Sequence, residues 1–166
     1  MIMGCNPMDI KILGCGNILA SDEGAGIHAV RKMNKYRMPN KVKILEIGRP
    51  GTFLLDYIIE AQCIYLIDAM VRGEEPGTIF RFETNGYPPE ELLGYSIHGF
   101  NLVDAYKLGM KQCPEKMPDK LIIQGIEIKE RGKFKSKLSP PVKKGVNKLV
   151  RELKKEVLEL YETSEI

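Results

Sequence analysis

The sequence predicts an α/β protein, a three-layer α/β/α sandwich around a five-stranded, mixed but mostly parallel sheet. Three observations lead to this prediction. Short apolar runs typical of strands alternate with longer segments whose apolar residues recur at helical spacing. The first strand runs into a glycine-rich turn that opens a helix. One connection is too short to hold a helix, so the strand that follows it should be antiparallel.

A single domain is expected from the 166 residues, with 1–8 as an extension and 9–160 as the α/β/α domain. Apolar residues make up 43% and charged residues 28%, which argues against disorder. The formal charge of +3 is small and gives little support to nucleic-acid binding. The chain has no signal-peptide pattern and no apolar run of the roughly 18 residues needed to span a bilayer. We therefore expect a cytoplasmic protein with no membrane contact. A monomer is also expected.

The first half of the chain is predicted to contain three strands separated by two helices. Ile27, Val30 and Met33 recur at helical spacing in the first helix. The third strand is almost entirely apolar, as in a central strand covered on both faces, and should stop at Asp68. The expected elements are a strand at 9–14, a helix at 23–36, a strand at 42–47, a helix at 52–61 and a strand at 63–67.

The second half begins with the turn Glu74-Glu75-Pro76-Gly77, which leads directly into the expected antiparallel edge strand. Ser139 and Pro140 supply an N-cap and a first-turn proline for a long final helix, whose charged side should face solvent. The expected elements are a strand at 78–82, a helix at 100–111, a strand at 121–128 and a final helix from 140 onward.

The turn after the first strand contains both glycines and an acidic pair, Asp22-Glu23. Its glycines would suit a dinucleotide phosphate, with Glu46 near the end of strand two as a ribose-binding acid. However, Leu19 stands where the G-x-G-x-x-G fingerprint needs its third glycine, and the acidic pair would repel a phosphate. Cys15 lies in this turn and is expected to pack as a small buried hydrophobe.

Three side chains able to bind a metal are expected beyond the carboxyl ends of the strands, where open α/β sheets bind ligands. Glu23 follows the first strand, Asp68 ends the third, and His98 enters the third main helix. Two carboxylates and an imidazole suit a divalent transition metal such as Zn or Ni, with positions open for another ligand. A helix N-terminus disfavours the charged form of His98, which leaves its imidazole able to ligate.

Each of these residues also has a structural alternative. Glu23 and Asp22 could merely occupy a first helical turn, where acids are favoured. Asp68 could cap a strand end, and His98 could be a surface or capping residue. The expected convergence of all three on one edge of the sheet favours a functional site. His28, by contrast, is expected to be structural.

These motifs resemble the [NiFe]-hydrogenase maturation endopeptidases, and the similarity covers about residues 9–158. The segments that carry it are Leu13-Gly14-Cys15-Gly16-Asn17-Ile18-Leu19, Ser21-Asp22-Glu23-Gly24-Ala25-Gly26, Ile67-Asp68-Ala69, Pro76-Gly77-Thr78, Ser96-Ile97-His98 and Leu138-Ser139-Pro140-Pro141-Val142. The resemblance implies a phosphorylase/hydrolase-like fold with strand order 2-1-3-5-4 and an antiparallel fourth strand.

The resemblance also implies an activity. Members of this family remove a short C-terminal extension from the [NiFe]-hydrogenase large-subunit precursor after nickel insertion. Their metal-contacting residues correspond to Glu23, Asp68 and His98, which would be the catalytic residues and the metal ligands. We expect the nickel to be contributed by the precursor rather than held permanently, and other divalent metals such as Zn or Cd could occupy the same site.

Several questions stay open at this point. Many relatives carry an aspartate followed by Gly-Gly-Thr after strand two, whereas this chain has Glu46-Ile47-Gly48-Arg49-Pro50-Gly51, where Arg49 could contact an acidic group of the substrate. A coenzyme F420-reducing hydrogenase is one candidate partner. Metal-assisted hydrolysis and carboxylate general-base attack are both open, with Asp22 as a candidate base. A nickel-sensing chaperone that binds the precursor without cleaving it is the second function class.

Overall fold

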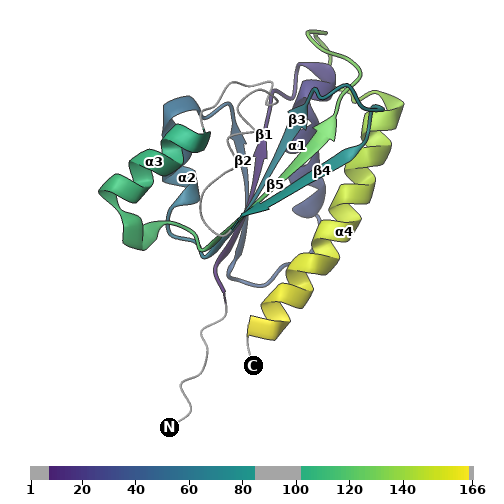
Figure 1. Cartoon of the computed structure of the whole chain (residues 1–166). Helices are drawn as coiled ribbons and strands as arrows, with labels where there is room; N and C mark the ends of the chain where they lie inside the picture. Colours follow the sequence, from purple (N-terminus) through teal and green to yellow (C-terminus); the bar gives the residue numbers. More distant parts are fainter. Residues whose placement is uncertain (1–7, 85–101, 165–166) are drawn as a thin grey trace.

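A five-stranded sheet lies at the centre of the computed structural model, which describes residues 8–84 and 102–164 (Figure 1). Its strand order is β2-β1-β3-β5-β4, and every neighbouring pair is parallel except β4 and β5. The strands are β1 (Ile10–Cys15), β2 (Val42–Gly48), β3 (Cys63–Met70), β4 (Ile79–Thr84) and β5 (Lys120–Glu127). The predicted α/β fold class, the strand order and the antiparallel edge strand are confirmed.

Helices cover both faces of the sheet, as Figure 1 shows. On one face lie α1 (Ala25–Met33) and α4 (Pro140–Ser164), which pack on side chains such as Ile12 and Tyr65. On the other face lie α2 (Leu54–Ile58) and α3 (Leu102–Gln112), which pack on Leu13 and Leu66. Successive strand residues alternate between these two apolar clusters, so each face of the sheet has its own core.

The central strand β3 is longer than predicted, because it continues past Asp68 to Met70 and all eight of its residues are buried. Asp68 pairs with Gly125 in the parallel ladder, so the aspartate lies inside the strand and the prediction that the strand stops there is wrong. Strand β5 continues alongside β3 and supplies backbone partners beyond Asp68. The alternation of β3 places Asp68 on the α2–α3 face with Leu66 and Met70.

Both predicted helices of the first half are shorter in the structure. The segment before α1 is a separate 3₁₀ helix, η1 (Ser21–Gly24), and α2 is preceded by the 3₁₀ turn η2 (Gly51–Phe53). Helix α2 ends at Ile58 because the next residue, Ile59, has an extended backbone with a ψ of 161°, and Glu60 then takes a positive φ of 63°. At this helix end the Lys11 ammonium of β1 donates hydrogen bonds to the carbonyls of Tyr57 and Ile59.

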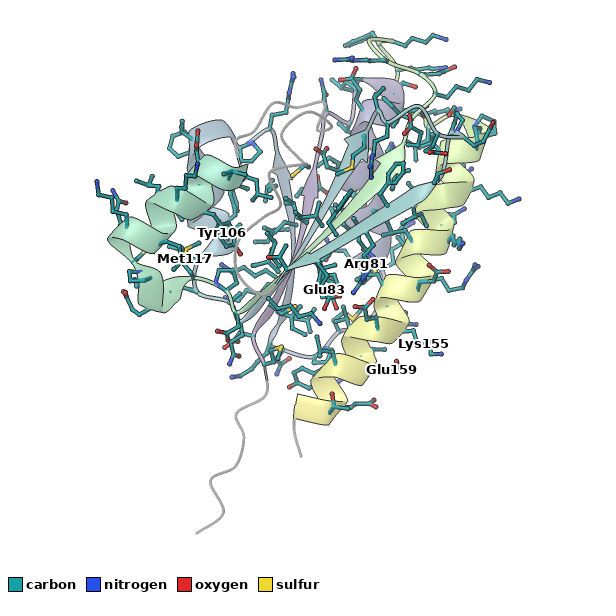
Figure 2. All side chains as sticks on the ribbon, viewed as in Figure 1. Arg81, Glu83, Tyr106, Met117, Lys155 and Glu159 are labelled. Carbon is teal, nitrogen blue, oxygen red and sulfur yellow. The ribbon has the colours of Figure 1, made fainter. Side chains whose placement is uncertain are left out.

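Helix α4 is fixed to the sheet by polar contacts as well as by its apolar side. The Tyr65 hydroxyl donates to Glu156 at 2.7 Å, and Arg81 on β4 pairs with the same carboxylate at 2.8 Å. Figure 2 shows Arg81 and Glu83 together on β4, where their side chains form an ion pair at 3.0 Å. Among the described residues, none of the helices combines the length and the apolarity that crossing a bilayer requires.

Candidate functional site

The glycine turn after β1 brings η1 against the carboxyl ends of β1 and β3. Gly16 has a φ of +133°, and a Cβ there would collide with the carbonyl oxygen of Glu23. A Cβ on Gly26 would collide with the carbonyl oxygens of Cys15 and Ile67. Glycine is therefore required for this close approach, which carries Asp22 and Glu23 to the carboxyl edge of the sheet.

A second segment, the β5–α4 loop (residues 128–139), is hydrogen-bonded along η1. Ser21 has a φ of 53°, an uncommon conformation for a residue with a side chain. Its backbone N–H donates to the Lys135 carbonyl at 2.7 Å, and its hydroxyl donates to Glu130 at 3.0 Å. The loop thus holds η1 from a position more than 100 residues away in the chain.

Asp22 is fully buried and both of its carboxylate oxygens accept hydrogen bonds from this loop. Oδ1 accepts from the Ser139 backbone N–H at 2.7 Å. Oδ2 accepts from the backbone N–H groups of Lys129 and Glu130 at 3.1 and 2.7 Å and from the Ser139 hydroxyl at 2.8 Å. These four donors give Asp22 a structural role and argue against its use as a general base.

Glu23 is 9% exposed and belongs to η1 rather than to α1. Its Oε1 accepts a hydrogen bond from the Gly132 backbone N–H at 2.9 Å. Since η1 follows the end of β1 and packs against β3, Glu23 lies at the predicted edge of the sheet. The β5–α4 loop therefore contacts both members of the acidic pair.

Asp68 is 1% exposed, and its Oδ1 accepts the N–H of Ala69 at 2.8 Å. Ile67, one residue earlier, pairs with Gly14, so Asp68 lies level with the start of the glycine turn. Burial and the nearby charge of Asp68 raise the pKa of the Cys15 thiol well above its usual value. A fully buried thiol of this kind stays protonated, which agrees with the expected packing role of Cys15.

Two of the three predicted site residues therefore lie at the carboxyl edge of neighbouring strands. The third, His98, lies outside the described residues. Within 8–84 and 102–164, no three His, Cys, Asp or Glu side chains form a group that could hold a metal ion. The carboxylates Glu23 and Asp68 are the part of the predicted ligand set that the structure describes at this edge.

The structure also places the other residues considered from the sequence, namely Glu46, His28 and Arg49. Glu46 forms a two-point ion pair with Arg31 of α1, at 2.8 and 3.0 Å, so its carboxylate is engaged away from any ribose site. The His28 ring contacts the Ser136 carbonyl of the β5–α4 loop at 3.1 Å, which agrees with a structural role. Arg49 is exposed at the end of β2, on the same edge of the sheet as the site.

Sequence reasoning missed the residues that hold the site together. The sequence predicts Ser139 as an N-cap, and this residue does precede α4, but its hydroxyl donates to Asp22. Ser21 and Glu130 gave no signal as partners, since their contact spans 109 residues. The available signal was weak: an acidic pair in a glycine turn and a basic segment before Ser139, both of which suit several structures.

Comparison with known proteins places these features in one family. The family model HycI, described as hydrogenase maturation protease, matches residues 27–156. The hydrogenase expression/formation protein HoxM of Azotobacter vinelandii is 30% identical over 139 residues, covering 81% of this chain and 65% of HoxM. The hydrogenase 2 maturation protease of Escherichia coli is 31% identical, covering 72% of this chain and 73% of that protein.

Solved structures show the same similarity. The hydrogenase maturating endopeptidase HybD from E. coli superposes with a TM-score of 0.78 at 27% identity, covering 92% of this chain and 93% of HybD. The [NiFe] hydrogenase maturation protease HybD from Thermococcus kodakarensis gives a TM-score of 0.72 at 28% identity, over 90% of this chain and 99% of that one. The chain spans about two thirds of the length of the first curated relatives, 65% for HoxM and 66% for HupM of Azotobacter chroococcum.

Proposed function

The chain belongs to the hydrogenase maturation protease family, and from this premise we propose that it is an endopeptidase that removes the C-terminal extension of a [NiFe]-hydrogenase large-subunit precursor. The observation that carries the proposal is the placement of two buried carboxylates, Glu23 and Asp68, at the carboxyl edge of a sheet shared with HybD. Ligands of open α/β sheets bind at this edge.

In this proposal the nickel belongs to the substrate. Glu23 and Asp68, together with His98, would contact the nickel already inserted in the precursor, so that cleavage follows metal insertion. Both side chains are buried at this edge, and carboxylate oxygens are ligands that divalent metal ions accept in proteins. Zn or Cd ions offered in solution would compete for the same oxygen and nitrogen donors.

Hydrolysis requires a water molecule whose oxygen attacks the scissile carbonyl carbon while the C–N bond breaks. The attacking water loses one proton to a base, and the departing amine gains one. Asp22 does not suit the role of base, since both of its oxygens are held by backbone and hydroxyl donors. Glu23 or Asp68 would accept the proton, or the precursor's nickel would lower the pKa of the water.

Cleavage of nickel-loaded precursor, followed by mass spectrometry of its C-terminus, tests the proposal. The wild-type chain should release the extension, whereas Asp68→Asn and His98→Ala should slow release at least about 100-fold. Glu152→Gln, an exposed acid on α4, is the matched control and should cleave at the wild-type rate. Wild-type rates in both site variants would refute the site assignment, and an unchanged precursor mass with tight nickel-dependent binding would favour the chaperone.

A further inference from the structure

The β5–α4 loop carries a concentration of positive charge. Every second residue from 129 to 137 is basic, and all five of these side chains are exposed: Lys129, Arg131, Lys133, Lys135 and Lys137. Glu130 is the one acid between them, so this segment has a formal net charge of +4 against +3 for the whole chain. Such a segment attracts an acidic partner and accelerates its encounter.

An aromatic side chain lies in the middle of these cations. Phe134 is 88% exposed, more than any other large hydrophobic side chain of the described residues. The next most exposed, Phe53, is 69% exposed. An exposed aromatic side chain flanked in the sequence by cations has the composition of a protein interface, where aromatic anchors are enriched and charges form the rim.

The loop presents these side chains on a fixed backbone. The Lys135 carbonyl accepts from Ser21, and Gly132 and Glu130 donate their N–H groups to Glu23 and Asp22. Lys133 and Lys135 also pair with Glu130, at 3.2 and 2.6 Å. Because the backbone is already ordered, a partner would bind without the entropic cost of ordering the loop.

The same contacts place the loop beside the candidate site. The N–H of Gly132, two residues before Phe134, lies 2.9 Å from the Glu23 carboxylate. A peptide that reaches Glu23 would therefore pass within side-chain reach of Arg131, Lys133 and Phe134. Nucleic acid fits less well, because Glu23 and Asp68 would repel its phosphates at this edge.

We propose that the β5–α4 loop is the docking element for an acidic segment of the precursor next to the cleaved bond, with Phe134 inserted into an apolar recess of that segment. This inference rests on the proposed function, since it names the chemistry of the substrate that reaches Glu23. The acidic side chains of the segment pair with the exposed cations around the ring.

The test measures affinity and turnover with nickel-loaded precursor and the full chain. Phe134→Ser and the double variant Arg131→Glu/Lys137→Glu should each raise the dissociation constant and KM about tenfold or more, with a far smaller change in kcat. Added salt should weaken wild-type binding more than binding by the double variant. Thermal unfolding of each variant should match that of the wild type.

Matched controls carry the same chemical changes far from the loop. Leu108→Ser removes an exposed apolar side chain from α3. The double variant Lys35→Glu/Lys155→Glu reverses two exposed charges, one in the connection between α1 and β2 and one on α4. Both should bind precursor as the wild type does. Wild-type affinity in both loop variants would overturn the inference, whether or not the precursor is cleaved.

The outcomes also separate this inference from the proposed activity. If the loop variants lose precursor binding but the wild-type chain leaves the precursor mass unchanged, the docking role stands and the proposed cleavage falls. If the wild-type chain cleaves and the loop variants bind as well as it does, the activity stands and the docking role falls. Loss of oligonucleotide binding in the loop variants, with precursor binding intact, would replace the peptide partner by a nucleic acid.

Discussion

The regions around Asp22 and Glu23 differ, although the two acids are adjacent in the chain and both are buried. Asp22 faces the start of α4 and the beginning of the β5–α4 loop, and four donors saturate its carboxylate. Glu23 faces the middle of the same loop and the carboxyl edge of the sheet, where Asp68 also lies. Asp22 therefore joins two distant parts of the chain, whereas Glu23 belongs to the candidate site.

This difference shows how a functional carboxylate is held in place in this fold. Glu23 cannot shift without its neighbour, and Asp22 ties η1 to Ser139, 117 residues away. Because the two residues are adjacent in the chain, the hydrogen bonds of Asp22 also fix the position of Glu23. Substitution of Glu23 should therefore lower activity with little effect on stability, whereas substitution of Asp22 should lower stability.

The largest expected effect is on turnover at Glu23. Glu23→Gln keeps the size of the side chain but removes its charge, so processing of nickel-loaded precursor should slow by about 100-fold or more. The free energy of unfolding should change little, because an amide oxygen can still accept from Gly132. Single-turnover cleavage and urea unfolding measure the two quantities. Full activity in this variant would contradict the assignment of Glu23 to the site.

The largest expected effect on stability is at Asp22. Asp22→Ala leaves four donors without their acceptor in a buried region, so the free energy of unfolding should fall by about 3 kcal/mol. Urea unfolding measures this loss. Ser139→Ala removes one donor and should cost about 1 kcal/mol. A stable Asp22→Ala variant that has lost only activity would instead make Asp22 part of the chemistry.

Gly26→Ala tests the close approach of the start of α1 to β1 and β3, which carries Asp22 and Glu23 to the carboxyl edge of the sheet. The new Cβ would collide with the carbonyl oxygens of Cys15 and Ile67, so we expect a loss of about 2–3 kcal/mol in thermal or urea unfolding. Gly51→Ala is the control, because Gly51 has open space around it and only its φ of 54° is unfavourable. That control should cost about 1 kcal/mol. Equal losses at the two positions would contradict the steric explanation.

The smallest expected effect concerns the pH dependence of the loop contacts. Hydrogen bonds from Lys135, Lys133 and Ser21 lower the pKa of Glu130 to about 2. Since the folded pKa lies below the unfolded value, the stabilisation by Glu130 is present above about pH 4.5 and is lost as the pH falls toward 2. The melting temperatures of wild type and Glu130→Gln should therefore converge over this range. A constant difference would show that Glu130 acts through packing instead.

The sequence by itself determined the fold class, the order of the elements and the antiparallel edge strand. These features follow from local signals: apolar periodicity, as in Ile27, Val30 and Met33, and the short connection before β4. The glycine turn also predicted that Glu23 reaches the carboxyl edge. Strand and helix ends were less accurate, because pairing with β5 extends β3 through Asp68 and the extended backbone of Ile59 ends α2 early.

Only the tertiary structure decided which of the two adjacent acids is structural. Asp22 and Glu23 have the same charge and the same local sequence context, and both would suit the first turn of a helix. What separates them is the direction of each side chain toward a loop more than 100 residues away. Hydrogen bonds over such separations form only when the sheet brings β1 and β5 to either side of β3. Local sequence patterns therefore do not predict them.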